Sequence, residues 1–465
     1  MKKALIITLS LMMVIFGLVG CSNDDKKQES NNDSQVEYNI ADTQKVEDAL
    51  KDESWVVVDT RLNDAFNGWK LDGISRGGRI KGAVDFSANW LNVEVDEKKV
   101  NKEEVLNEAL ETKGITKDKN IVLYDANGKD SKEVAAYLKE KGFNNLYLYD
   151  VNKWADDDKL SMERYENYQL IVPASITKDV IDGKKPESFE NAKNIKIVEA
   201  SWGEEKTSYA KGHIPTSFHI NTDEIEPPAV EPPMMWMLAD DETLAKVALK
   251  YGFTKDDTVI VTGEEPMSSY RVATVLRYIG VKDVRVLNGG TMAWTMAGYE
   301  LETTSNKATP VEDFGGVIPG NPDVIDTMEE TKEGLKTPDK FTLVDNRTWD
   351  EHIGKSSGYS YHDKMGRVPG SVFGYAGKTD SYSLDYYRNI DKTMRNANEF
   401  LDLWKKQGID TTKHLSFMCG SGWRVAEIYT YSDVVGLEDI SIFSDGWIGW
   451  SNDSSNPTET GEPKK

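Results

Sequence analysis

The stretch LSFMCGSGWRVAEI, residues 415–428, decides the fold of the segment around it. An apolar run typical of a buried strand ends abruptly at Cys419, and Gly420, Gly422 and Arg424 follow before a helical pattern begins. A strand, a glycine-rich turn and a helix in this order are typical of an α/β unit. A lone thiol at the head of such a turn is a candidate nucleophile.

The turn favours the thiolate form of Cys419. Gly420 and Gly422 allow the backbone to curl with its N–H groups pointing inward, which forms an anion-binding nest. The helix expected over about 425–435 adds the positive end of its dipole, and Arg424 adds a full charge. Because the thiolate is the reactive form of cysteine, these surroundings indicate a catalytic residue. The alternative is a buried, inert cysteine that packs as a small apolar side chain.

This loop resembles the active-site loop of the rhodanese family of sulfurtransferases. Its start, Cys-Gly-Ser-Gly, is similar to the loop of 3-mercaptopyruvate sulfurtransferases, and its Trp-Arg ending resembles that of three-domain periplasmic rhodaneses. The resemblance implies a thiolate at Cys419 that takes a sulfane sulfur, carries it as a persulfide and passes it to a nucleophilic acceptor. The residues expected to bind the persulfide or substrate are Gly420, Ser421, Gly422, Trp423, Arg424 and, outside the loop, Arg347.

The N-terminus predicts export and lipid anchoring. Residues 1–20 carry two lysines and then a long apolar run, which is typical of a secretory signal. The small residues before Cys21 look like a bacterial lipobox, which implies cleavage there and lipidation of the Cys21 thiol. An uncleaved anchor helix is the alternative. Both place the folded part outside the cytoplasm at the cell membrane, with the polar segment 21–36 as a tether.

Charge and composition narrow the function classes. The formal net charge is −23, and removal of the first twenty residues with their two lysines brings it to −25, which argues against nucleic acid as a partner. With Cys21 lipidated, Cys419 has no partner for an intramolecular disulfide. The five histidines show no ligand spacing with cysteines or acids, so neither a metal nor an organic cofactor is expected.

Three segments of the 465-residue chain repeat one order of features. Each has a β-branched run that ends at an acid, a glycine-bounded turn, a second apolar strand with a helix, and a closing strand with a tryptophan. The acids are spaced by 140 and 146 residues, and the tryptophans by 140 and 156. These markers are Asp59, Glu199 and Asp345, and Trp154, Trp294 and Trp450.

The repeats predict an α/β protein with three tandem rhodanese-like domains, each a parallel β-sheet with helices on both faces. The predicted divisions are a signal peptide at 1–20, a lipidated tether at 21–36, domains at 37–170, 171–309 and 310–455, and a loose tail at 456–465.

Only the third domain is expected to be catalytic. Asp125 stands in the place of the cysteine in the first domain, and Thr262 or Gly263 stands there in the second. The first two domains are therefore expected to be structural, or to shape a cleft beside the third. The Asp-x-Arg pair of Asp345 and Arg347 also has a structural interpretation, because a carboxylate after a buried strand commonly fixes the next turn. His213 is expected to be structural.

The expected reaction moves sulfur from a small anionic donor, thiosulfate or 3-mercaptopyruvate, to a thiol or cyanide. The six residues from Cys419 to Arg424 favour this over the related phosphatases and arsenate reductases, whose loop has seven. One departure from the family is Glu351, which takes the place of a second arginine that holds the donor. Arg424 could substitute for it, and so could Arg367 or Lys355 in the stretch 354–370.

Two other classes of function stay open at this point. The chain could be a non-catalytic scaffold or sulfur carrier that binds a partner protein, or it could hold a redox-sensing thiol. The stretch 354–370, with Tyr359 and Tyr361, is either a lid or a solvated surface loop.

Overall fold

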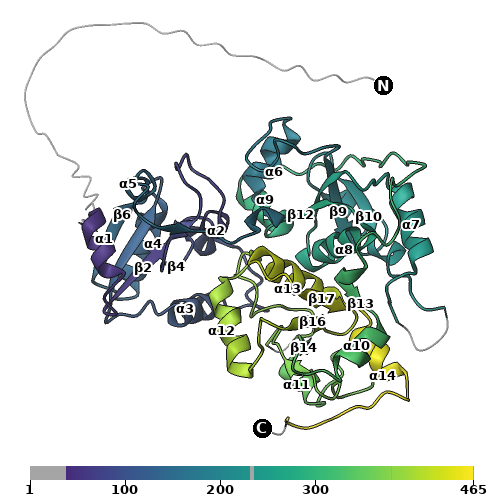
Figure 1. Cartoon of the computed structure of the whole chain (residues 1–465). Coiled ribbons are helices and arrows are strands. Elements are labelled where there is room, and N and C mark those ends of the chain that lie inside the picture. The colour runs from purple at the N-terminus through teal and green to yellow at the C-terminus, as the bar shows by residue number, and fades with distance from the viewer. Residues whose placement is uncertain (1–37, 231–234, 379, 464–465) are drawn as a thin grey trace, which may run out of the picture. The chain divides into compact units, whose positions relative to one another are not determined.

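The computed structural model describes residues 38–230, 235–378 and 380–463. The chain divides into a unit that ends at Tyr38 and a second unit, Asn39–Lys465, which contains three five-stranded sheets (Figure 1). The expected signal peptide, the tether and Cys21 lie outside the described residues. None of the helices in the described ranges combines the length and the apolarity that a bilayer crossing requires.

The first sheet has the strand order β1-β6-β5-β2-β4, and all its strands are parallel. A short antiparallel ribbon, β3 with β7, lies beside it. The strands are β1 (Asn39–Ile40), β2 (Trp55–Asp59), β3 (Arg79–Ile80), β4 (Val84–Asp85), β5 (Asn120–Asp125), β6 (Leu146–Asp150) and β7 (Met162–Glu163). The helices are α1 (Thr43–Ala49), α2 (Asn63–Asn67), α3 (Lys102–Thr112), α4 (Asp130–Glu140) and α5 (Asn152–Ala155).

The second sheet has the order β10-β9-β11-β12-β8 and is again parallel. Its strands are β8 (Ile171–Val172), β9 (Lys196–Ser201), β10 (Phe218–Asn221), β11 (Thr258–Thr262) and β12 (Asp283–Leu287). Its helices are α6 (Ala174–Ile181), α7 (Asp241–Lys250), α8 (Pro266–Ile279) and α9 (Gly290–Met296).

The third sheet has the order β13-β17-β16-β14-β15, and its strands are parallel. Its strands are β13 (Ile325–Asp326), β14 (Phe341–Asp345), β15 (Val372–Phe373), β16 (His414–Met418) and β17 (Ile440–Phe443). Its helices are α10 (Met328–Gly334), α11 (Trp349–His352), α12 (Ala397–Gln407), α13 (Trp423–Val434) and α14 (Gly446–Asn452).

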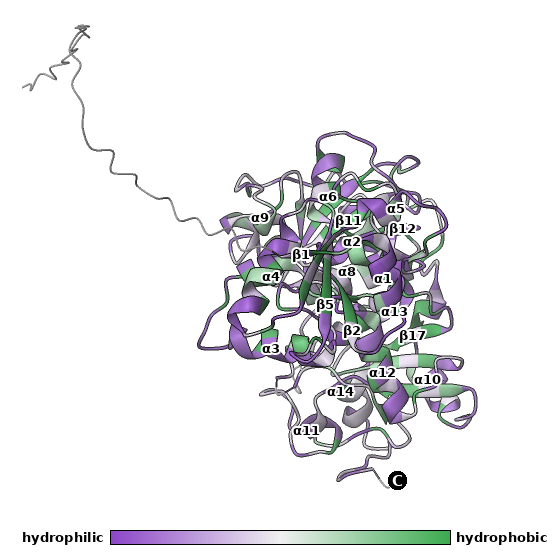
Figure 2. Cartoon of the chain, turned by 90° about the vertical axis from the view of Figure 1, so that its left-hand side faces the viewer, coloured by the Kyte–Doolittle hydropathy of each residue, from purple (hydrophilic) through white to green (hydrophobic). Residues whose placement is uncertain are grey.

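The three sheets share one topology. In each, the fourth strand in chain order is central, and the first lies at one edge beside the fifth. The central strands are apolar because helices cover both faces of each sheet, and Figure 2 shows β2 and β5 in the colour of hydrophobic residues. The predicted fold of three repeated α/β domains is thereby confirmed.

The three closing tryptophans are core residues, as expected. Trp154, Trp294 and Trp450 lie on the short helices that follow the last strand of each sheet, and all three are buried. The C-terminal stretch differs from the loose tail that its polar sequence predicts, because Glu459 pairs through its main chain with Arg367.

Helices α8 and α13 join the second domain to the third and lie side by side (Figure 1). The rings of Tyr270 and Tyr431 meet edge to face with centroids 5.3 Å apart. Arg277 of α8 pairs with Asp433 of α13 at 3.5 Å. The glycine-rich loop that precedes α13 also lies beside the second domain, because Gly422 closely approaches Arg271 of α8.

Candidate active site

The register of the sheets fixes which residues are equivalent to Cys419. Asp345 pairs with Met418 across β14 and β16, and Cys419 is the next residue. In the first domain Asp59 pairs with Tyr124, so Asp125 is equivalent to Cys419. In the second domain Glu199 pairs with Thr262, which places Gly263, and not Thr262, at that position.

Cys419 lies at the carboxyl end of the central strand β16. Its carbonyl oxygen accepts a hydrogen bond from the Trp447 N–H at 2.8 Å, and that of Gly420 accepts one from Ile448 at 3.0 Å. These bonds occupy the loop carbonyls, while α13 begins at Trp423 and leaves its first N–H groups without intrahelical partners. Cys419 is only 1% exposed, so the cysteine is buried at the end of its strand.

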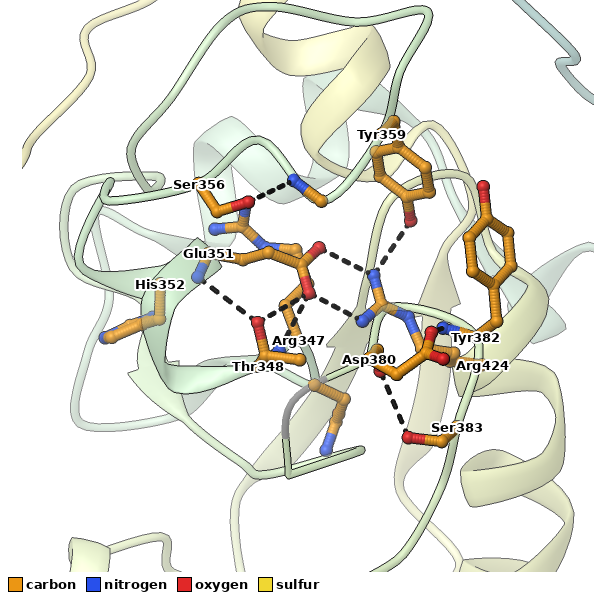
Figure 3. Close-up of polar contacts among 12 residues, drawn as sticks. Arg347, Thr348, Glu351, His352, Ser356, Tyr359, Asp380, Tyr382, Ser383 and Arg424 are labelled. Atoms are coloured by element: carbon orange, nitrogen blue, oxygen red, sulfur yellow. Dashed lines mark hydrogen bonds and ion pairs between the residues drawn. The ribbon is translucent and has the colours of Figure 1, made fainter. Parts of the chain in front are cut away.

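The sequence suggested that Arg424 presents a free positive charge to a donor, but in the structure this charge is paired. Its Nη1 and Nη2 donate to the two carboxylate oxygens of Glu351 at 2.9 and 3.0 Å, and both side chains are buried (Figure 3). Burial would lower the pKa of the guanidinium, but Glu351 raises that pKa well above its usual value. Likewise burial would raise the pKa of Glu351, and the ion pair with Arg424 holds it below its usual value.

This ion pair explains the departure at Glu351. The residue occupies the place of the family's anchoring arginine and binds the loop arginine instead of a donor. Thr348 fixes it further, because the Thr348 N–H and hydroxyl both donate to the Glu351 carboxylate, at 3.0 and 2.9 Å (Figure 3). The loop consequently has a neutral ion pair where a sulfurtransferase with two arginines has excess positive charge.

The stretch 354–370 supplies Tyr359 to the loop. Arg424 Nη2 donates to the Tyr359 hydroxyl at 2.8 Å (Figure 3). A side chain at Gly420 would collide with the ring of Tyr359. Burial raises the pKa of Tyr359, so the phenol stays protonated. Gly420 is therefore required by this close approach.

Aromatic side chains from the second and third domains form a series of ring contacts next to the Cys419 loop. The ring centroids of Trp423 and Trp202 lie 5.5 Å apart, and those of Trp202 and Trp236 lie 6.1 Å apart. The centroids of Trp236 and Tyr361 lie 5.2 Å apart, and those of Tyr361 and Tyr359 lie 5.3 Å apart. This series, here called the aromatic wall, begins at Trp423 of the Cys419 loop and ends at Tyr359, whose hydroxyl accepts a hydrogen bond from Arg424 of the same loop. The sequence did not indicate the two tryptophans of the second domain, because no local pattern links them to aromatic residues so far along the chain.

The second domain also contributes an ion pair at the loop. Glu226 is buried and accepts hydrogen bonds from Arg271 Nε and from the Trp423 indole. Arg271 is fully buried, and its Nη2 donates to the Ser444 hydroxyl at 2.7 Å. Trp423, expected to contact the persulfide, thus has its indole N–H directed to the second domain.

Arg347 plays the structural part that the sequence also allowed. It donates to both oxygens of Asp345 at 2.7 Å and to the Gly366 carbonyl at 2.8 Å. Arg61 makes the same contacts with Asp59 and Gly78 in the first domain, which lacks the cysteine. The same geometry in a domain that lacks the cysteine favours the structural interpretation of Arg347 over a contact with the substrate.

The other candidate anchors lie elsewhere. Lys355 is an exposed partner of Asp350, and Arg367 pairs with Glu459. His213 is buried and bonds to the Tyr209 carbonyl at 2.8 Å, as a structural residue does. Within the described ranges, no group of three or more His, Cys, Asp or Glu side chains is arranged to hold a metal ion.

The topology and the cysteine loop define a tandem sulfurtransferase-type protein, and comparison with known families identifies it. The rhodanese-like domain family matches residues 42–156, 185–297 and 327–453, and the chain belongs to the rhodanese family. Thiosulfate sulfurtransferase YnjE of Escherichia coli K12 is 33% identical over 420 residues, which are 89% of this chain and 91% of that protein. Thiosulfate sulfurtransferase of Bos taurus is 24% identical over 266 residues, covering 55% of this chain and 84% of its own.

Solved structures of related proteins also match this chain over most of its length. EanB in complex with ergothioneine has a TM-score of 0.84 and 33% identity, covering 92% of this chain and 100% of that chain. An anaerobic ergothioneine biosynthesis enzyme from Chlorobium limicola, in complex with trimethyl histidine, matches with the same values. This kinship supports sulfur transfer as the general activity of the chain.

Proposed function

We propose that the chain is a sulfurtransferase that carries sulfane sulfur as a persulfide on Cys419. The observation that carries this proposal is the position of Cys419, which lies between the central strand and the N-terminus of α13 in a chain of this family. Cys419 is the free cysteine of the described residues, and the second cysteine of the chain lies outside them. The redox-sensor and phosphatase alternatives explain neither the three domains nor the six-residue loop.

The reaction is a double displacement. The thiolate attacks the outer sulfur of thiosulfate, a sulfur–sulfur bond forms to Cys419, and the bond to the departing sulfite breaks. Cyanide or a thiol then attacks the outer sulfur and releases the Cys419 thiolate. The N–H groups at the start of α13 stabilise the persulfide anion, in the way that an oxyanion hole stabilises an alkoxide.

The test is to load the protein with thiosulfate and to follow sulfur by mass spectrometry and thiocyanate release. One added sulfur is expected on the peptide that contains Cys419, and none at Asp125 or Gly263. Cys419→Ser should abolish transfer while leaving the free energy of unfolding nearly unchanged, because the replacement differs by one atom. Full activity in this variant, or sulfur bound elsewhere in the chain, would contradict the proposal.

The buried Arg424–Glu351 pair affects which sulfur donors we expect to load Cys419 efficiently. Thiosulfate is a dianion, and 3-mercaptopyruvate also carries a carboxylate, whereas the loop arginine is already neutralised. We expect either donor to need a high concentration, and an uncharged organic polysulfide to load Cys419 more efficiently. A panel of these donors, compared by kcat/KM, distinguishes the two cases.

A second candidate acceptor is a trimethylated histidine. The structural relatives bind trimethyl histidine or ergothioneine, and one carries a cysteine persulfide in a tetrahedral intermediate state. In this chain the aromatic wall offers ring faces, which attract a quaternary ammonium group. Transfer would form a carbon–sulfur bond at the imidazole ring, break the sulfur–sulfur bond and move the ring proton to the released thiol, so no oxidant is required.

The persulfide form provides the test. Protein loaded with sulfur and then mixed with trimethylhistidine should give ergothioneine, detected by mass, if this acceptor is used. If only cyanide and thiols accept sulfur, the general sulfurtransferase function stands and this acceptor is excluded. A scaffold without catalysis would load no sulfur at all.

We also propose that the mature protein is anchored to the outside of the cell membrane through lipidated Cys21, on the basis of the lipobox. Lipidation that adds two or more acyl chains gives stable anchoring. Cys21→Ala should release the protein from membranes or leave it unprocessed, as fractionation and intact mass would show. A processed, membrane-bound variant would exclude the lipobox.

A further inference from the structure

Arg271 brings the second domain into direct contact with the sulfur loop of the third. Its guanidinium is fully buried, and it divides its donors between Glu226, in its own domain, and Ser444, in the third. The remaining nitrogen, Nη1, has no hydrogen-bond partner among the described residues. A methyl group in place of the Gly422 hydrogen would come within 2.6 Å of this atom.

These contacts hold the loop from two sides. Gly422 has a φ of 91°, a left-handed conformation that determines where the following N–H groups point. Trp423 is held through its indole by Glu226, the partner of Arg271. Ser444 precedes the turn into α14, whose Trp447 N–H binds the Cys419 carbonyl.

The electrostatics of the site depend on this geometry. Arg424 is neutralised by Glu351 and Arg271 by Glu226, so little unbalanced side-chain charge is available for a persulfide anion. Asp445 also lies near Arg271, and burial raises the pKa of its carboxyl while Arg271 lowers it. Stabilisation of the anion then rests mainly on the main-chain N–H groups, which act only when they are aimed at the sulfur.

We propose that Arg271 is a positioning residue of the sulfur-transfer site, which fixes Gly422 directly and Trp423 through Glu226. The second domain, which has no nucleophile of its own, thereby completes the active site of the third. This inference rests on the proposed function of Cys419. It predicts that loss of Arg271 lowers the rate of the chemical steps more than it weakens donor binding.

The experiment compares Arg271→Met with Arg277→Met in the full-length protein. Both variants remove an arginine from α8 that faces the third domain, but Arg277 pairs with Asp433, well past the start of α13. Arg271→Met should lower kcat about 10- to 100-fold and change the donor KM less than about 3-fold. Arg277→Met should retain the kcat of the wild type.

Glu226→Gln provides an independent test of the same contact. It should lower kcat in the same direction, and the double variant with Arg271→Met should be no slower than Arg271→Met alone, because the two residues act as one unit. Arg271→Lys keeps the charge but not the forked geometry, so it should give an intermediate kcat. If Arg271→Met does not fold, the lysine variant and Glu226→Gln decide the question.

The outcomes separate this inference from the proposed function. Wild-type kcat in both Arg271→Lys and Glu226→Gln, with an inactive Cys419→Ser, would overturn the positioning role and leave the sulfurtransferase intact. A rise in donor KM with unchanged kcat would make Arg271 a donor-binding residue and would also overturn it. Activity in Cys419→Ser would instead remove the function on which the inference rests.

Discussion

At the scale of single residues, two buried arginines with glutamate partners distinguish this site. Each carboxylate stands where it cancels a charge that would otherwise attract an anion. The sequence located Glu351 and identified it as unusual, but it did not reveal the partner. Arg424 lies 73 residues further along the chain, and the pairing requires that α11 and α13 meet at the same end of the sheet.

Glu351→Gln tests what this cancellation does. Removal of the carboxylate leaves the Arg424 charge uncompensated near Cys419, so alkylation of the thiol should have its pH midpoint at a lower pH. The kcat/KM for thiosulfate should rise relative to that for a neutral donor. The free energy of unfolding should fall by about 3 to 5 kcal/mol, because a buried ion pair is broken.

Asp59→Asn is the matched control for this substitution. The Asp59–Arg61 pair is equally buried, but it lies in the domain without a cysteine. It should lose stability and keep the wild-type alkylation profile. If Glu351→Gln loses stability yet also keeps that profile, the Arg424–Glu351 pair serves the fold alone.

At the scale of secondary-structure elements, the sequence predicted most of what the structure contains. Apolar runs gave the central strands, and the repeated order of features gave three equivalent sheets. The start of α13 was placed two residues late, at Val425, because the left-handed Gly422 allows the helix to begin at Trp423. Local patterns did not reveal Glu226 or Arg271, since contacts between domains depend on how finished elements pack.

The strand β16 provides a pH-dependent prediction. His414 begins this strand, and its ring bonds to Asp439 at 2.6 Å and to Ser441 at 2.9 Å, with Asp326 of β13 close by. Hydrogen bonding to Asp326, then to Asp439, raises the pKa of His414 to about 9, although burial opposes the shift. A raised histidine pKa gives stability that is fully present below about pH 6.5 and is lost as the pH rises through 9.

The measurement is the melting temperature between pH 6 and 10. The wild type should lose stability across that range, and His414→Gln should show a flatter profile with a lower value at pH 6. Asp439→Asn should reproduce part of the change, because Asp439 is one of the two carboxylates that bond to the His414 ring. An unchanged pH profile in His414→Gln would show that other groups set the slope.

At the scale of the whole folded unit, one buried polar junction links all three domains. Asn288, which follows β12 of the second domain, donates to Asp64 of the first at 2.8 Å and accepts from the Met394 N–H of the third at 3.0 Å. Asp391 of the third domain bonds to Asn89 of the first at 3.3 Å. We expect such a junction to couple the unfolding of the three domains, because separation of one domain would leave buried polar groups of the others without partners.

Asp64 makes this junction sensitive to pH. Burial raises the pKa of its carboxyl to about 7, the Asn288 hydrogen bond opposes the shift, and the nearby Asp391 adds to it. Since the folded state holds the proton more tightly than the unfolded chain, the stabilisation is fully present below about pH 4 and is lost as the pH rises through 7. The loss reaches on the order of 4 kcal/mol at most.

Asp64→Asn removes the titration while its amide oxygen still accepts the Asn288 bond. The variant should match the wild type near pH 4.5 and exceed it in stability at pH 8, because no buried carboxylate then has to ionise. Chemical denaturation at both pH values measures this, with His414→Gln as the control, because that variant should lose stability relative to wild type at pH 4.5 and lose less at pH 8. A single transition should persist in each variant, since all three domains share the junction. If Asp64→Asn has the same stability relative to wild type at both pH values, the pKa of the Asp64 carboxyl does not differ between the folded and unfolded states, and this prediction is wrong.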